Sequence, residues 1–350
     1  MTSPRLIRAI LVNDTSLSGH FGCRIVVDQI RRLAARNGIE IVATCAMGTP
    51  YSQLCKRIDG FDLCLVNGEG TIHHDAPNGL TLVRVASFCR SRGIPAVLIN
   101  ALYQQNGPEF VDHVRNFDRV FVRDPLSLKE LEGIVDAEVV PDLVLSSDPG
   151  MLGADKRSGI LFTDHVNKNE ARRLFDFAAS LPGSTFLPME TLRPRLRRRK
   201  PSDRLRNIWA TCDYRLKKEL FKALGGVVGS GNPGYVPFKA VMFKGCGMED
   251  FLQALARCEL FVTGRFHGIC LAMLLRTPFL AVASNTFKVE ALLAEAGLQR
   301  RLVDSVEDVT EQISANLSWT VGELEGVEAL IENSQSSANN MFASIRNLVA

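Results

Sequence analysis

Residues 259–275 read ELFVTGRFHGICLAMLL, and this stretch decides the fold. Its opening apolar run is typical of a buried strand, Thr263-Gly264 turns the chain, and the apolar segment from Phe266 onward has helical character until Thr277-Pro278 ends it. A strand that leads directly into a helix is the unit from which a parallel sheet with helices on both faces is built.

The same alternation extends in both directions from this stretch. Short apolar runs predict strands at residues 6–12, 40–45, 62–66, 96–100, 119–122, 138–140, 160–163, 185–187, 260–263 and 279–283. Segments with helical spacing predict helices at residues 21–36, 50–58, 79–92, 124–132, 168–181, 213–224, 248–257, 266–275 and 286–297. The strand runs are continuously apolar rather than alternating, as buried parallel strands require. The pattern therefore predicts an α/β fold with parallel sheets.

The length of the chain and one polar break predict two domains. A chain of 350 residues exceeds the usual size of a single domain, and turn-forming residues gather at 148–158. We predict an N-terminal Rossmann-like domain at 1–150 and a C-terminal Rossmann-like domain at 158–320 that face each other across a cleft. The tail at 321–350 has helical spacing, and we expect it to pack back onto the body as a last helix.

Composition excludes several classes of protein. The net charge of +3 is too small for a dedicated nucleic-acid binder of this length. The nine cysteines are odd in number and contain no CxxC pair, so we expect neither a disulfide framework nor a Cys-rich zinc site. No signal peptide and no run of about 18 apolar residues is visible, which favours a cytoplasmic protein without a membrane span.

The strand-to-helix junction holds the strongest candidate site. Arg265 and His267 lie where a parallel strand ends and a helix begins, with Gly264 and Gly268 beside them. Ligands of open α/β sheets bind at the carboxyl ends of strands, and a helix N-terminus attracts anions. An arginine fork and a titratable imidazole at that place suit a phosphate or carboxylate substrate. The alternative is a helix cap with a hydrogen-bonded loop histidine.

Several motifs, taken together and in this order, resemble the polysaccharide pyruvyl transferase family. The C-terminal part of the resemblance is carried by residues 262–268, an apolar helix, 277–280 and 284–288. The N-terminal part is carried by residues 12–15, 19–23, 67–74, 122–127 and 140–142. Together they span roughly residues 10–300. The chain departs from many members at Asn67-Gly68-Glu69-Gly70, where they carry three glycines, and at Thr286-Phe287-Lys288, where they carry Asp-Pro-Lys; both departures bear on the acceptor.

The resemblance implies a fold like the two-domain GT-B glycosyltransferases, with the site in the interdomain cleft. It implies transfer of pyruvate from phosphoenolpyruvate to two hydroxyls of a sugar, forming a ketal, with no cofactor and no metal. The N-terminal domain would lie on the acceptor side and the C-terminal domain on the donor side. His267 matches the residue expected to donate a proton, and Arg265 matches the residue expected to hold the anionic donor.

Other polar residues at predicted strand ends are candidates for substrate binding. With the two glycines of the junction, the set is Asn13, Asp14, Asn67, Gly68, Glu69, Gly70, Gly264, Gly268, Asn285 and Lys288. The first two could instead cap the next helix, the Gly-rich segment at 67–74 could be only a tight turn between strand and helix, and Lys288 could simply begin a helix. Asp142 after Pro141 fits either a base or a turn cap.

Two further features concern metals and membranes. His73-His74 has no partner at metal-ligand spacing, so a metal site there is not favoured. A dense basic run at Arg193–Arg206 could hold the protein on anionic lipid, beside an acceptor that is lipid-linked, or could be a solvated loop. Two alternative functions stay open: a GT-B glycosyltransferase that uses a nucleotide sugar, and a non-catalytic sugar-phosphate binding protein.

Overall fold

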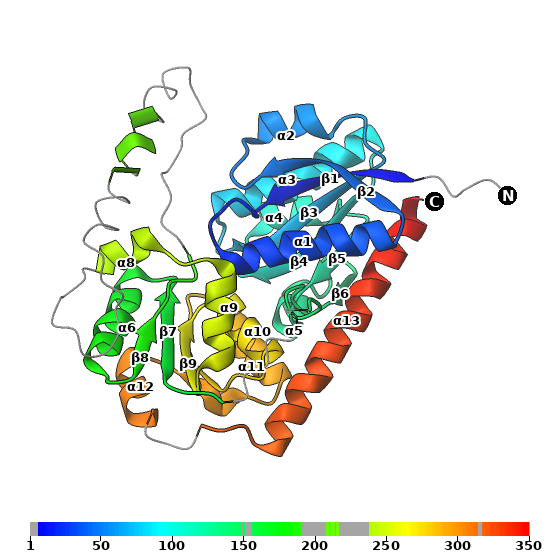
Figure 1. Ribbon diagram of the computed structural model, residues 1–350. Helices are drawn as coiled ribbons and strands as arrows, with labels where there is room; N and C mark the ends of the chain where they lie inside the picture. The colour runs from blue at the N-terminus through cyan, green and yellow to red at the C-terminus, as the bar shows by residue number, and fades with distance from the viewer. Residues whose placement is uncertain are drawn as a thin grey trace.

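The computed structural model of the chain describes residues 6–148, 150, 156–190, 208–209, 211–213, 215–216, 238–313 and 317–349. These residues form two parallel sheets, each covered by helices, which confirms the predicted α/β architecture (Figure 1). The basic run at 193–206 and most of the helix expected at 213–224 lie outside the described residues.

The N-terminal sheet has six strands in the order β2-β1-β3-β4-β5-β6, all parallel. Its strands are β1 (Ile7–Asp14), β2 (Ile39–Ala46), β3 (Leu63–His73), β4 (Ala96–Gln104), β5 (Arg119–Val122) and β6 (Ala137–Val139). Its helices are α1 (Phe21–Arg36), α2 (Tyr51–Ile58), α3 (Pro77–Arg92), α4 (Pro108–Val114) and α5 (Pro125–Glu130). Helix α4 was not predicted because its seven residues are too few to show a period.

The C-terminal sheet has five strands in the order β11-β10-β9-β7-β8, again all parallel. Its strands are β7 (Ile160–His165), β8 (Ser184–Phe186), β9 (Leu260–Gly264), β10 (Phe279–Val282) and β11 (Leu302–Val303). The helices around it are α6 (Lys168–Ser180), α8 (Phe238–Lys244), α9 (Met248–Arg257), α10 (Phe266–Leu274), α11 (Lys288–Glu295), the 3-10 turn η1 (Gln299–Arg301) and α12 (Val306–Gln312).

Two neighbouring strands are longer than predicted, and the strand expected at 96–100 continues as β4 to Gln104. The strand expected to end at Val66 continues as β3 to His73, so the Gly-rich segment is not a turn that leads into a helix. The reason is its neighbour β4, which is buried along its whole length and pairs with β3 as far as Gln104. A Cβ at Gly68 would lie 2.5 Å from the Cβ of Ala101, so glycine allows the two strands to approach here.

The last helix, α13 (Val321–Val349), runs from the C-terminal sheet back along the N-terminal domain (Figure 1). Its apolar side joins the same core as α1, α9 and α10. Ser334 Oγ donates a hydrogen bond to the carbonyl of Asp142, and Arg346 reaches the carbonyl of Asn37 at 2.9 Å. The helix therefore ties the two halves of the chain together. In the described part of the chain no helix combines the length and apolar character needed to cross a bilayer.

A buried ion cluster fixes the start of α13. The guanidinium of Arg301 is fully buried, lies 4.0 Å from the ring centre of Trp319, and donates to both carboxylate oxygens of Glu323 at 2.8 and 2.9 Å. Arg300 adds two bonds to the same carboxylate. Burial alone would raise the pKa of Glu323, but the hydrogen bonds from the two arginines hold it below its ordinary value.

We expect Glu323→Gln to lower the free energy of unfolding by about 3–5 kcal/mol, because it leaves the buried cation of Arg301 without its counter-charge. Glu328→Gln is the matched control on the same helix: its pair with Arg276 is exposed and 3.7 Å long, so the cost should stay below about 1 kcal/mol. Since the pKa of Glu323 is depressed, the difference between wild type and variant should shrink as the pH falls. Urea unfolding at two pH values measures both effects, and equal costs for the two variants would contradict this account.

Candidate functional site

The junction that decides the fold is built as the sequence predicts. Strand β9 ends at Gly264, Arg265 takes the N-cap position, and α10 begins at Phe266. The two glycines serve close packing: a Cβ at Gly264 would lie 1.8 Å from a ring carbon of His165, and one at Gly268 would lie 2.7 Å from Oγ1 of Thr263. Gly264 and Gly268 therefore allow the close packing that holds Arg265 and His267 at this junction.

His267 lies at the contact between the two domains. Its side chain is 9% exposed and lies in the first turn of α10, against the first turn of α1, where a Cβ at Gly22 would lie 2.4 Å from its Nδ1. On its other side Nε2 is 3.6 Å from Oδ2 of Asp142 and has no hydrogen-bond partner among the described residues. The ring of His20 is 5.3 Å away. His267 is thus tightly packed, while its Nε2 has no hydrogen-bond partner among the described residues.

Asp142 and Arg123 form a buried pair beside His267. Nη1 of Arg123 donates to Oδ2 of Asp142 at 3.3 Å, and both side chains are almost fully buried. Burial alone would raise the pKa of Asp142, but the charges of His267 and Arg123 hold it below its ordinary value. The guanidinium also lies 4.3 Å from the ring centre of Phe266. Its Nε and Nη2 are buried and find no hydrogen-bond partner within the described ranges.

Arg265 is held by two carboxylates. Its Nε and Nη2 donate to Oδ2 of Asp164, and Nη2 also donates to Oε2 of Glu190 at 2.6 Å. Burial would lower the pKa of Arg265, but these two anions raise it above its ordinary value. Arg265 therefore has two carboxylate partners, whereas Arg123 has one, Asp142. A ligand could be reached only by the part of the guanidinium that the carboxylates leave free.

Lys288 adds a third cation. Its Nζ lies 3.4 Å from Oδ1 of Asn285, at the start of α11. Burial, followed by the charges of Arg123 and Arg265, lowers the pKa of Lys288 to about 7. The same cations, after burial, lower the pKa of two neighbouring histidines: Arg265 acts on His20, and Lys288 acts on both His20 and His73. Mutual repulsion of this kind marks a place where an anion would be stabilised.

The end of β1 and the middle of β3 form a second polar group, on the N-terminal side. Nδ2 of Asn13 donates to the carbonyl of Asn67 at 2.7 Å, and the carboxylate of Glu69 accepts from Asn67 and from Thr15. Asn13 and Glu69 both have positive φ, 64° and 43°, a conformation that is costly for residues other than glycine and that often occurs at functional sites. Asp14 belongs to a different surrounding, because its carboxylate accepts from Ser16 and from Arg31.

The structure brings most of the predicted residues to one region between the domains. His267, Arg265, Asn285 and Lys288 come from the C-terminal sheet and face the ends of β1, β3 and β4; for example, the backbone N–H of Phe287 donates to Oε1 of Gln104. Gly70 lies next to Arg123: a Cβ at this position would be in van der Waals contact with its Nη2, at 3.6 Å. A pocket lined by Leu126, Lys129, Glu130 and Phe287 also lies between the domains.

Three residues in this region, Arg123, His20 and Asp164, were given no role from the sequence. Arg123 directly follows β5, so the strand-end rule that selected Arg265 would also have selected it. His20 precedes α1, and Asp164 lies one residue before the end of β7. Asp164 directly follows the strand predicted at 160–163, so the same rule would have selected it, whereas His20 carries no local signal because its partners are distant in sequence.

Comparison with solved structures supports the fold. The S. aureus MnaA protein in a co-structure with UDP has a TM-score of 0.55 and 13% identity, with 95% of this chain and 94% of that chain covered. A putative UDP-N-acetylglucosamine 2-epimerase from Listeria monocytogenes has a TM-score of 0.51 and 13% identity, with 96% and 94% covered. These likenesses confirm the GT-B-like two-domain arrangement. Among curated proteins no sequence matches the chain.

The family model for polysaccharide pyruvyl transferase matches residues 20–286, which is most of the chain. The matched region contains Arg123, Asp142, Arg265 and His267 and ends just before Lys288. It therefore includes most of the cations described above, on both sides of the domain contact. On this evidence the chain belongs to the polysaccharide pyruvyl transferase family and is a transferase.

Proposed function

We propose that the protein transfers pyruvate from phosphoenolpyruvate to two hydroxyls of a saccharide, in a cell-surface polysaccharide or its precursor, and so forms a ketal. One observation carries the proposal: the imidazole of His267 stands among Arg123, Arg265 and Lys288 at the contact of the two domains. A proton donor surrounded by cations is the arrangement that an anionic enol substrate needs.

The donor has two anionic groups, and the three cations differ in how far they are already paired in the free protein. Phosphoenolpyruvate carries a carboxylate and a phosphate, and Arg123 has unused N–H groups for one of them. Lys288, repelled by both arginines, gains a counter-charge when the second anion binds. Arg265 contributes through the edge that Asp164 and Glu190 leave free, and the two carboxylates fix its orientation. Binding of the donor therefore relieves repulsion that is present in the free protein.

The reaction then follows in balanced steps. His267 gives a proton to the methylene carbon of the enol, which leaves C2 as a cation-like centre. The first sugar hydroxyl forms a C–O bond to C2 and loses its proton. The bond from C2 to the phosphate oxygen breaks, and phosphate leaves with its electron pair. The second hydroxyl bonds to C2 and closes the ketal; of the two hydroxyl protons, one restores His267 and one leaves with phosphate.

We place the acceptor at the end of β1 and the middle of β3. The support is the polar group formed by Asn13, Asn67 and Glu69, which lies on the N-terminal side of the contact and offers oxygen acceptors to sugar hydroxyls. Gly70 follows Glu69 in β3, and a Cβ at this position would be in van der Waals contact with Nη2 of Arg123. The acceptor hydroxyls would then approach the donor from the opposite domain.

A single assay separates this function from its alternatives. Purified protein is incubated with phosphoenolpyruvate and candidate saccharides, and inorganic phosphate is measured. The proposal predicts phosphate release that depends on both substrates. Release of nucleoside diphosphate from a nucleotide sugar, with no phosphate from phosphoenolpyruvate, would instead indicate a glycosyltransferase. Binding of phosphoenolpyruvate without release would indicate a binding protein.

We expect catalysis to need no divalent metal, because cationic side chains can meet the donor's charges. Treatment with EDTA should therefore leave the rate of phosphate release unchanged within about twofold, or raise it. The rate is compared before and after treatment, and after later addition of magnesium or manganese. A complete loss that either ion restores would contradict the proposal and favour a nucleotide-sugar donor.

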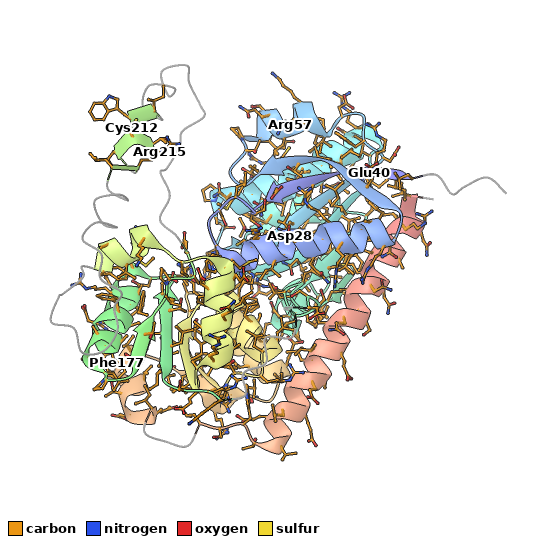
Figure 2. All side chains as sticks on the ribbon, viewed as in Figure 1. Asp28, Glu40, Arg57, Phe177, Cys212 and Arg215 are labelled. Atoms are coloured by element: carbon orange, nitrogen blue, oxygen red, sulfur yellow. The ribbon has the colours of Figure 1, made fainter. Side chains whose placement is uncertain are left out.

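We also propose peripheral contact with the cytoplasmic membrane surface through the basic run at Arg193–Arg206. The described residues just after it expose Ile208, Trp209 and Leu216, with Trp209 78% exposed. They belong to a short helical stretch, where Cys212 and Arg215 are seen to stand away from both sheets (Figure 2). Apolar and aromatic side chains beside basic residues are typical of segments that bind anionic bilayers.

Replacing Arg197, Arg198 and Arg199 by Ser should weaken binding to vesicles that contain anionic lipid, because each basic residue near such a surface contributes about 1 kcal/mol. Turnover of a water-soluble acceptor should change less than about twofold, since the run lies outside the proposed chemistry. Vesicle co-sedimentation at low salt measures the first effect. Equal binding of wild type and variant would rule out the lipid role.

A further inference from the structure

Three side chains at the domain contact carry donor atoms suited to a metal ion. His20 and Cys23 come from the start of α1, and His267 comes from the start of α10. Each offers one ligand atom, and these three atoms lie within 4.8 Å of one another. The spacing in sequence hides this group, because its members come from both domains.

Two ring nitrogens in this group are buried and have no hydrogen-bond partner among the described residues. Nδ1 of His20 and Nε2 of His267 find no hydrogen-bond partner in the part of the chain that the structure describes. The ring of His267 points its Nδ1 edge at α1, since a Cβ at Gly22 would lie 2.4 Å from that atom, and its Nε2 edge at Asp142. A metal-binding histidine often has its second nitrogen beside a carboxylate, as here. The buried Nδ1 of His20, which has no partner among the described residues, is therefore open to a metal ion.

We propose that His20, Cys23 and His267 bind a divalent ion of the zinc type, with the fourth position open, and that this ion inhibits the enzyme. Two imidazoles and one thiolate favour zinc or cobalt over magnesium or calcium. Zinc binds imidazole nitrogen at about 2.0–2.1 Å and thiolate at about 2.3 Å, so the ligand atoms need to close by only about 1 Å. The ion would join the two domains through their facing helices.

The inhibitory part rests on the proposed function, in which His267 gives a proton. An imidazole bound to a metal through Nδ1 cannot carry the protons of the imidazolium form, so it cannot serve as the acid. Binding also displaces the thiol proton of Cys23, which now donates to Oε2 of Glu69 at 3.2 Å. Zinc would thus remove the proton donor and alter the acceptor side in one step.

Cobalt supplies a direct readout of the site, because tetrahedral cobalt with a thiolate ligand has a charge-transfer band in the near ultraviolet. Full-length protein freed of metal with EDTA and then of EDTA is titrated with Co²⁺. We expect the band in wild type and in Cys55→Ser, whose cysteine lies on α2 away from the site. We expect its loss in Cys23→Ser and at least a roughly tenfold weaker affinity in His20→Gln. A missing band in wild type, or an unchanged band in Cys23→Ser, would overturn the site.

Phosphate release is then measured in the same preparations with and without Zn²⁺. Zinc should lower the wild-type rate, EDTA should restore it, and the ratio of inhibited to uninhibited rate should move toward one in His20→Gln. If cobalt binds as predicted but zinc leaves the rate unchanged or raises it, the inhibitory role is wrong. If no phosphate is released even without metal, the cobalt spectra still decide the site, and it is the proposed pyruvyl transfer that fails.

Discussion

Replacing His267 with Gln should lower the single-turnover rate of phosphate release by about 100- to 10,000-fold, the usual contribution of general acid–base catalysis. Glutamine roughly preserves the volume that packs against Gly22 and the first turn of α1, but it has no proton to give. Affinity for phosphoenolpyruvate should change only a few-fold, because the donor's charges are met by the three cations rather than by this ring. Rapid-quench kinetics and calorimetry measure the two quantities separately.

The affinity measurement also serves as the folding control for this variant. Because His267 lies at the domain contact, a general structural defect would weaken donor binding and lower the melting temperature together with the rate. A correctly folded His267→Gln protein with a near-normal rate would show that the residue only positions other groups. His267→Ala, which also removes the packing against Gly22, should be no faster than His267→Gln.

Arg123→Gln should weaken binding of phosphoenolpyruvate more than any other single change at the site, by roughly 10- to 150-fold. Loss of a hydrogen bond to a charged group costs about 1.5–3 kcal/mol, and Arg123 has two nitrogens whose N–H groups are not engaged in the free protein. Arg265→Ala should also weaken binding, by about tenfold or more. Lysine at either position should restore only part of the affinity, because an ammonium lacks the bidentate fork. Calorimetric titration of each variant with the donor gives the comparison.

A lysine variant tests whether Arg123 contributes more than Arg265 to the affinity for the donor. If Arg123→Lys, which keeps the charge beside Asp142, binds the donor as tightly as wild type, Arg123 has only a structural role.

Lys288 adds a pH dependence: its pKa of about 7 means that the cation is present below that pH and lost above it. Donor affinity should therefore fall as the pH rises through about 7, and this part of the fall should disappear in Lys288→Met.

The parts of this protein that could be predicted from sequence are those with local causes. The apolar strand, the turn at Thr263-Gly264 and the apolar helix after it are adjacent in the chain, so their pattern predicts both the junction and the position of Arg265 and His267. The continuous apolar strands likewise indicate a parallel α/β protein.

The remaining features depend on neighbours that are distant in the chain. The length of β3 depends on its pairing with β4, and the sequence at Gly68 fits a turn and a close strand contact equally well. The partners of Arg265 are Asp164 and Glu190, which no local pattern connects to it. Which arginine keeps unengaged N–H groups could therefore be learned only from the packed structure.

The proposed reaction requires that the enol of phosphoenolpyruvate is protonated at its methylene carbon during transfer. The most direct test is to run the reaction with donor and acceptor in D₂O and in H₂O and to compare the masses and proton spectra of the products. We expect a ketal methyl group that carries deuterium only in D₂O, formed together with one phosphate per ketal. A product that contains the pyruvate carbons but has no solvent deuterium in its methyl group would contradict it, as would sugar modification without any phosphate release.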